Sequence, residues 1–262
     1  MIQRFFSQAW LYHKGRTDAF HFSDFIASEV GYPAITMIFY CLLATYGFQT
    51  MDLTHWVVSN SFLLCTNTCI FNLGTVFLGE RYNGRLRSIV VAPYSTLSLV
   101  LASGIGPILT ASVTVAFNMT LGSLIFGVDF SGVPLGAVIL TILCAMTSAT
   151  CFGLLISIFG MISSSIHLML NIIHYVLMLF TGAQFPVSQL PIPCQILSRL
   201  LPLTRSIQAM DLLFERTGES TSRFASLLIG ELGMAVLYVL LACTVFHSVE
   251  RACCHSGRFD LF

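Results

Sequence analysis

Charged side chains are scarce in this sequence, and their scarcity excludes most soluble folds. Asp, Glu, Lys and Arg make up 9% of the 262 residues, whereas 56% are hydrophobic and the mean hydropathy is +0.84. Soluble globular domains carry about 25% charged residues, so this chain has more apolar side chains than one soluble core can bury. The net charge of zero gives no support for nucleic-acid binding. We predict an all-α polytopic membrane protein with a single transmembrane domain, residues 1–262.

Sequence motifs of several enzyme classes are also absent. No G-x-x-x-x-G-K-[ST] phosphate loop occurs, so we expect neither ATP hydrolysis nor a cofactor in this chain. His167-x-x-x-Asn171 resembles a motif of intramembrane proteases and prenyl-processing enzymes, but their E-E-x-x-x-R motif is missing, as are H-E-x-x-H and G-x-S-x-G. Without a C-x-x-C pair, the nine cysteines do not support a metal site. Cys253 and Cys254 therefore remain palmitoylation sites or inert thiols.

Long apolar segments predict six membrane crossings, because one crossing needs about 20 predominantly apolar residues. The predicted spans are residues 30–48, 55–79, 97–127, 133–160, 166–185 and 224–248. We expect the third to kink near Gly104, Gly106 and Pro107. Segment 186–222 is too polar to cross and is rich in proline, which predicts short re-entrant helices. Helical spacing of apolar residues near the N-terminus predicts an interfacial helix within residues 1–28.

The positions of Lys and Arg predict the orientation of the chain. With six crossings, eight basic residues fall on one side and four on the other. The eight are Arg4, Lys14, Arg16, Arg81, Arg85, Arg87, Arg251 and Arg258, and the four are Arg199, Arg205, Arg216 and Arg223. Because the more basic side faces the cytoplasm, both termini are predicted to be cytoplasmic and segment 186–222 to face outside. The expected location is the cytoplasmic (inner or plasma) membrane.

Three stretches resemble the permease subunit of ABC transporters of the type-2 membrane family, which has the type V exporter fold. Residues 80–95 resemble its cytoplasmic coupling helix, E-R-x-x-G-x-L followed by P-x-S. Residues 181–191 resemble the exit of its fifth span, S/T-G-x-x-F/Y-P followed by L-P. Residues 201–209 resemble the L-P-L-T-x-x-x-x-A that closes its outer re-entrant segment.

The resemblance implies that loop 80–96 docks on a separate ATPase subunit. The residues expected to couple the two subunits are Glu80, Arg81, Gly84, Arg85, Leu86, Arg87 and Pro93. Arg87 stands where the family often has an acidic residue and Arg85 replaces a common small one, so this patch is more basic than usual. ATP and Mg²⁺ are expected on the partner subunits, and two permease chains, identical or homologous, in one pore. Without the resemblance, the patch is equally typical of a positive-inside loop.

The resemblance also implies that the second and fifth spans line the transport path. We expect the lining to include polar residues of these spans, namely Asn60, Asn67, His167, Asn171 and His174. The alternative is that they form interhelical hydrogen bonds of roughly 0.6 kcal/mol each. The expected outer gate comprises Phe185, Pro186, Leu190 and Pro191.

Two acidic residues also fall at membrane depth in this reading. Glu231, inside the sixth span, is expected to be either protonated or paired with an outer arginine. Glu29, at the start of the first span, is expected near the coupling-loop arginines.

Together these features predict an ATP-driven exporter of a hydrophobic or amphiphilic substrate, such as a drug, a lipid or an antimicrobial peptide. A polysaccharide or polymer exporter of the same family is the alternative within transport. A membrane immunity or scaffold protein that transports nothing is the alternative outside it, and it predicts no ATPase partner.

Overall fold

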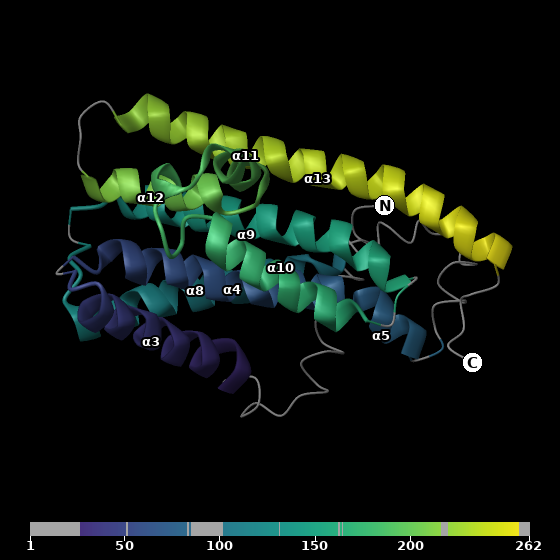
Figure 1. Ribbon diagram of the computed structural model, residues 1–262, viewed down its shortest axis with the longest axis horizontal. Helices are drawn as coiled ribbons and strands as arrows, with labels where there is room; N and C mark the ends of the chain where they lie inside the picture. Colours follow the sequence, from purple (N-terminus) through teal and green to yellow (C-terminus); the bar gives the residue numbers. More distant parts are fainter. Residues whose placement is uncertain are drawn as a thin grey trace.

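The chain forms a bundle of long helices in a computed structural model (Figure 1). The structure describes residues 27–50, 52–82, 84, 102–130, 132–161, 163, 165–215 and 220–256, and every regular element within these ranges is helical. The longer helices are α3 (Tyr32–Gly47), α4 (Thr54–Gly74), α8 (Ile105–Phe126), α9 (Leu135–Ser157), α10 (Ile166–Phe180), α12 (Thr204–Glu215) and α13 (Ser220–Ser256). The shorter ones are η1 (Ala27–Gly31), α5 (Val76–Tyr82), η2 (Ile158–Met161), η3 (Val187–Gln189) and α11 (Ile192–Leu200).

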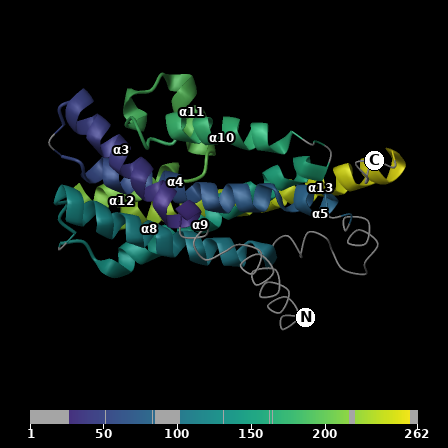
Figure 2. The same ribbon diagram turned by 90° about the horizontal axis from the view of Figure 1, so that it is seen from below.

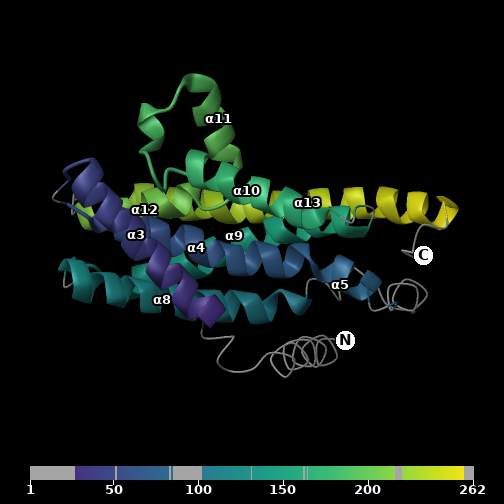
Figure 3. The ribbon, with the colours of Figure 1, turned by 60° about the horizontal axis from the view of Figure 1, so that its bottom comes forward.

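Helix α4 is the central element of the bundle. It packs against α3, α8, α9 and α10, and α13 covers the other side of α9. Figures 2 and 3 show α10 and α11 on one face of the bundle and α8 on the opposite face, with α4 and α9 between them. Large α4 side chains such as Phe62, Leu63 and Ile70 are almost completely buried. Several polar side chains in the middle of α4 are buried as well, and some donate to the carbonyl four residues earlier, as Ser61 does to Val57 at 2.6 Å.

Glycines allow the helices around α4 to approach it closely. A Cβ on Gly122 of α8 would lie 2.3 Å from Cγ1 of Val57, and one on Gly153 of α9 would lie 3.0 Å from Cα of Ile70. Small residues at such positions are typical of helix contacts in membranes, where backbones pack without a hydrophobic driving force.

Four described helical segments are long and apolar enough to cross a membrane: Glu29–Gly47, Ile105–Phe126, Leu135–Gly160 and Thr221–Val249. The predicted second span is divided at Thr75 into α4 and α5, which are bent by 41° and count as a fifth crossing if taken together. The predicted fifth span is shorter than expected. Helix α10 has 15 residues, about 22 Å at 1.5 Å per residue, because the chain turns at Thr181–Phe185, where Gly182 has φ +91°.

Two other boundaries differ from the predicted ones. The last helix, α13, has 37 residues, begins at Ser220 and continues to Ser256, well past residue 248. The third span breaks near Gly104 as expected, since residues 102 and 103 are helical, Gly104 is a turn, and α8 starts at Ile105. Segment 186–222 contains η3, α11, α12 and the start of α13. Most of the predicted interfacial helix and of loop 80–96 lies outside the described residues.

Candidate functional site

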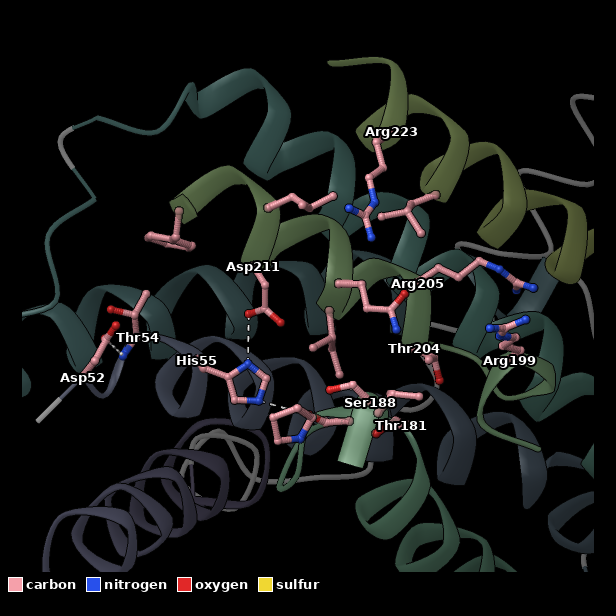
Figure 4. A pocket seen from close by; sticks show the side chains of 18 of the residues that line it. Asp52, Thr54, His55, Thr181, Ser188, Arg199, Thr204, Arg205, Asp211 and Arg223 are labelled. Carbon is pink, nitrogen blue, oxygen red and sulfur yellow. Dashed lines mark hydrogen bonds and ion pairs between the residues drawn. The ribbon is translucent and has the colours of Figure 1, made fainter. Parts of the chain in front are cut away.

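A polar cavity of about 1340 Å³ opens at the end of the bundle where α4 begins and α8 ends (Figure 4). Its walls come from five separate stretches of chain: the start of α4, residues 129–133, residues 181–188, helices α11 and α12, and the start of α13. The polar side chains that line it are Asp52, Thr54, His55, Asp129, Thr181, Ser188, Gln195, Arg199, Thr204, Arg205, Gln208, Asp211 and Arg223.

His55 connects three of these stretches. Its Nδ1 lies 2.9 Å from Oδ1 of Asp211 on α12, and its Nε2 lies 3.1 Å from the carbonyl oxygen of Gly182. A carbonyl oxygen and an ionised carboxylate both accept hydrogen bonds, so the ring satisfies both only as the imidazolium. His55 therefore forms an ion pair that ties α4 to α12 and to the turn after α10. Nearby, the Thr54 backbone N–H donates to Asp52 Oδ1 at 3.0 Å and lowers the pKa of that carboxyl.

Three arginines occupy another part of the cavity wall, which Figure 4 shows on the side away from Asp52 and His55. Arg199 lies in the last turn of α11, Arg205 near the start of α12 and Arg223 near the start of α13. Within the described part of the chain, none of the three has a carboxylate within 4.0 Å. Nη1 of Arg205 is buried without a hydrogen-bond partner there, and an unsatisfied buried donor costs about 1–3 kcal/mol.

Glu231 supports the corner between α11 and α12 from behind. It is fully buried on α13, and its Oε1 accepts the backbone N–H of Leu203 at 2.9 Å. Leu203 has φ +75°, a left-handed conformation that costs a leucine about 1–2 kcal/mol. Tyr238, also on α13, donates its hydroxyl to the carbonyl of Leu200 at 2.5 Å. The direct partner of Glu231 is therefore a backbone amide of the outer segment, while Arg205 attracts it from beyond ion-pair distance.

The predicted lining residues are not brought together in one chain. Asn60 is fully buried: its Nδ2 donates to Trp56 O, and its Oδ1 accepts from Nε2 of Gln184, both at 2.8 Å. His167 and Asn171 are exposed on α10. His174 is half-buried, and its Nδ1 is a buried atom with no hydrogen-bond partner among the described residues. The side chain of Asn67 lies outside the described part.

The predicted gate residues lie between α10 and α11 at the cavity. Phe185 is 40% exposed and meets Phe48 edge to face, with 6.3 Å between ring centroids. Pro186 lines the cavity, Leu190 is half-buried and Pro191 is exposed. Of the four predicted gate residues, Pro186 therefore forms part of the cavity wall.

The described coupling residues lie at the opposite end of the bundle. Glu80 is buried and Arg81 half-buried in α5, which follows α4 after a bend of 41° (Figure 1). Gly84 forms a turn with φ +65°, and its N–H donates to the carbonyl of Arg81 at 3.1 Å. The turn therefore explains glycine in the E-R-x-x-G pattern, because other residues rarely adopt this conformation. Arg85, Leu86, Arg87 and Pro93 lie outside the described residues.

The carboxylate of Glu29, on η1, contacts helix α4. Its Oε2 accepts the hydroxyl of Thr68 on α4 at 2.6 Å. The predicted pairing of Glu29 with the coupling-loop arginines stays a prediction, because two of the three, Arg85 and Arg87, lie outside the described residues.

Sequence reasoning missed His55, Asp211 and Gln184 as site residues. The three arginines of the cavity served to predict orientation and were considered as partners of Glu231, but not as residues of a site. The sequence contains only a weak signal for these residues. His55 is the first residue of a predicted span, and Asp211 lies in a segment already assigned as polar. The partners of His55 are more than 120 residues away along the chain, and no spacing rule for single helices connects such positions.

Comparison with known proteins agrees with the resemblance of the three sequence motifs. No curated protein matches the chain. The family model described as ABC-2 type transporter matches residues 20–214, which is well over half of the 262 residues. The match includes α3 to α12, the coupling residues and most of the lining of the polar cavity. The chain therefore belongs to the ABC-2 type transporter family, as a membrane-embedded permease subunit.

Proposed function

We propose that this chain is the membrane-spanning subunit of an ATP-driven exporter of a hydrophobic or amphiphilic substrate. The observation that carries the proposal is the family match over residues 20–214 together with the E-R-x-x-G-x-L stretch at residues 80–86. ATP and Mg²⁺ bind to separate ATPase subunits. Closure of these subunits moves the coupling helices and the membrane spans attached to them. The chain itself supplies the path and no catalytic residue.

In this proposal the α5 end of the bundle is cytoplasmic and the polar cavity faces outside. The support is the excess of Lys and Arg on the α5 side in a six-crossing topology. The α4–α5 pair is then the second crossing and α10 the fifth, with the buried turn Thr181–Gln184 completing its short length. Helices α11 and α12 form the re-entrant segment, and residues 1–28 lie in the cytoplasmic interface.

A second permease chain covers α10 in the proposed assembly. Exposed apolar side chains follow one stripe of this helix, namely Leu168, Ile172, Tyr175 and Leu179. The adjacent positions His167 and Asn171 are also exposed, and polar groups at membrane depth are expensive when they face lipid. A neighbouring chain or a water-filled path satisfies them. We therefore propose that His167, Asn171 and His174 line the path between two chains, with Asn60 and Asn67 behind them on α4.

The gate residues give the proposed path an outer end. Phe185, Pro186, Leu190 and Pro191 join α10 to α11 in a segment with little regular structure. Outward movement of α10 displaces this segment together with the rim of the polar cavity. The Phe48–Phe185 ring contact is then a contact of the closed state.

The proposal is tested by purifying the tagged chain from its own host in mild detergent and identifying what accompanies it. We expect an ABC ATPase subunit in the wild-type sample, with ATP hydrolysis above background. The combined variant Glu80→Ala/Arg85→Glu/Arg87→Glu should lose both. Arg199→Glu, a charge reversal at the other end of the bundle, is the matched control and should retain the ATPase.

Two outcomes contradict the proposal. If no ATPase accompanies the wild type, the chain is better described as an immunity or scaffold protein. If the ATPase accompanies the combined variant as well as the wild type, residues 80–87 do not dock it. Accumulation of a labelled amphiphile in inverted vesicles, dependent on ATP, then distinguishes small amphiphiles from polymers as cargo.

A further inference from the structure

We propose that the polar cavity contains a binding site for the phosphate group of an amphiphile, formed by Arg199 and Arg205 with Arg223 adding positive charge. The site goes beyond the proposed function, because binding needs neither ATP nor a partner subunit. Its residues come from α11, α12 and α13.

Two acidic side chains of the cavity are bonded to neighbouring groups, whereas its three arginines form no ion pair with a described carboxylate. Asp211 is bound to His55, and Asp52 accepts the Thr54 amide. The three arginines, in contrast, have no carboxylate within 4.0 Å among the described residues. Asp129 also lines the cavity, and Glu231 attracts Arg205 from beyond ion-pair distance. Three guanidinium groups that line one cavity with no carboxylate at ion-pair distance create a local positive potential that attracts an anion.

The backbone brings two of these arginines to one corner. Arg199 ends α11 and Arg205 begins α12, and only the turn Leu201–Leu203 separates the two helices. Glu231 and Tyr238 hold this turn on α13 through Leu203 N–H and Leu200 O. The corner is therefore held in place, and the two guanidinium groups extend from it into the same cavity (Figure 4).

Arg205 is also held against α13 in a way that leaves a donor unused. A Cβ on Gly230 would lie 3.0 Å from Cδ and 3.1 Å from Nε of Arg205, so the arginine packs directly on the glycine. Its Nη1 is buried and has no acceptor in the described structure. Arg205 also lines the cavity, and a planar guanidinium can bind two phosphate oxygens at once through its remaining donors.

The surroundings favour an amphiphile over a purely water-soluble anion. On α11, Gln195 and Arg199 line the cavity, while Ile192, Ile196 and Leu200 are 74%, 60% and 53% exposed on the adjacent stripe. One short helix thus presents a polar stripe to the cavity and an apolar stripe beside it. A phosphate head group bound by the arginines would place its acyl chains along these apolar residues.

The site is tested by binding to the purified full-length chain in detergent, without nucleotide. The probes are dioctanoyl-phosphatidylglycerol, which carries a phosphate, dioctanoylglycerol, which lacks it, and inorganic phosphate. We expect the wild type to bind the phospholipid at least tenfold more tightly than dioctanoylglycerol. Arg199→Gln and Arg205→Gln should each weaken binding of the phospholipid about tenfold, and Arg223→Gln less.

Two glycines on α13 provide a matched pair that keeps every arginine. Gly230→Ala places a methyl group against Arg205, whereas a Cβ on Gly233 has no neighbour within 4 Å. We expect Gly230→Ala to weaken phospholipid binding severalfold and Gly233→Ala to leave it unchanged. Arg81→Gln, at the α5 end, is the control for removal of one positive charge.

Competition with inorganic phosphate shows which part of the phospholipid the site recognises. If inorganic phosphate at millimolar concentration displaces the phospholipid, the site recognises the phosphate group itself; if it does not, the apolar stripe of α11 is needed as well. Both results support an arginine-dependent site. Equal binding of dioctanoylglycerol and the phospholipid, or unchanged binding in well-folded Arg199→Gln and Arg205→Gln variants, overturns it. This binding measurement does not depend on whether an ATPase subunit co-purifies with the chain, so each proposal can be refuted without the other.

Discussion

The two ends of the bundle are built from polar residues in different ways. At the α5 end, the polar residues come from one continuous stretch, from Glu80 to the arginines that follow. At the cavity end they come from five stretches, and pairs such as His55–Asp211 join residues 156 positions apart. A short motif therefore describes the first end, whereas only the packing of α4 against α12 and the turn after α10 creates the second.

The difference also concerns stability. At the cavity end, polar groups hold structural elements together, as Glu231 does for Leu203 and Asn60 for Gln184. At the α5 end, the described turn at Gly84 is exposed and nothing lies within 4 Å of its Cβ position. Substitutions at the cavity end should thus change the stability of the fold, and those at the α5 end should change binding of a partner.

The largest effect on stability is expected for Glu231→Leu. This change removes the acceptor of the buried Leu203 N–H, and an unsatisfied buried donor costs about 1–3 kcal/mol. We expect a lower thermal unfolding midpoint in detergent, followed by tryptophan fluorescence. Glu231→Gln retains an acceptor oxygen, so its unfolding midpoint should fall less than half as far as that of Glu231→Leu. Equal midpoints for Glu231→Leu and the wild type would show that the corner is held by packing alone.

At the α5 end, Gly84→Ala should act on the partner and not on the fold. Alanine at φ +65° is disfavoured by roughly 1 kcal/mol, so the turn after α5 should change its conformation. We expect several times less ATPase to co-purify, with an unchanged unfolding midpoint. Gly84→Asn is the control, because asparagine tolerates the left-handed region. A large loss of stability in Gly84→Ala would remove the distinction between the two ends.

The bond between Asn60 and Gln184 should contribute a smaller amount. Hydrogen bonds between helices in membranes average about 0.6 kcal/mol, with a maximum of about 1.7 kcal/mol. We expect a coupling energy in this range from a double-mutant cycle of Asn60→Leu and Gln184→Leu, measured by unfolding in denaturing detergent. Strictly additive single changes would mean that the two amides do not stabilise each other.

The smallest effect is expected at Asp52, which is exposed and accepts the Thr54 amide at the start of α4. Asp52→Ala should cost about 0.5 kcal/mol, the low end of what is lost when a side-chain oxygen no longer accepts a backbone N–H at the start of a helix. The hydrogen bond lowers the pKa of Asp52 in the folded chain. Its contribution is therefore complete above the unfolded pKa of about 3.9 and is lost as the pH falls through the folded pKa. In unfolding measurements as the pH is lowered below about 5, Asp52→Asn should not show this loss of stability.

The sequence was sufficient where hydropathy alone decides the structure. The spans at 30–48 and 133–160 correspond closely to Glu29–Gly47 and Leu135–Gly160, because each is an unbroken apolar segment. Prediction was poorer where backbone geometry decides. Gly182 at φ +91° ends α10 early, and the break at Thr75 divides the second span, yet neither position carries a charge that would interrupt a hydrophobic span.

The candidate site was predicted only in part for the same reason. The residues predicted as the gate stand together in one motif, and one of them, Pro186, lines the cavity. The role of His55 depends on Asp211 and the Gly182 carbonyl, and the role of Glu231 on the backbone of Leu203. Contacts of this kind exist only after the helices have packed, and a polar residue in a span does not indicate which partner it will meet.

The uninterrupted length of α13 has a mechanical consequence. Its 37 residues extend about 55 Å at 1.5 Å per residue, well beyond a hydrocarbon core of about 30 Å. Near one end Glu231 holds the α11–α12 corner, and further along Phe246 stacks on Phe77 of α5, with ring centroids 6.1 Å apart. Because α13 is one continuous helix, a tilt that moves it at one of these contacts also displaces it at the other. Movement at one end of the bundle is therefore transmitted through α13 to the other end.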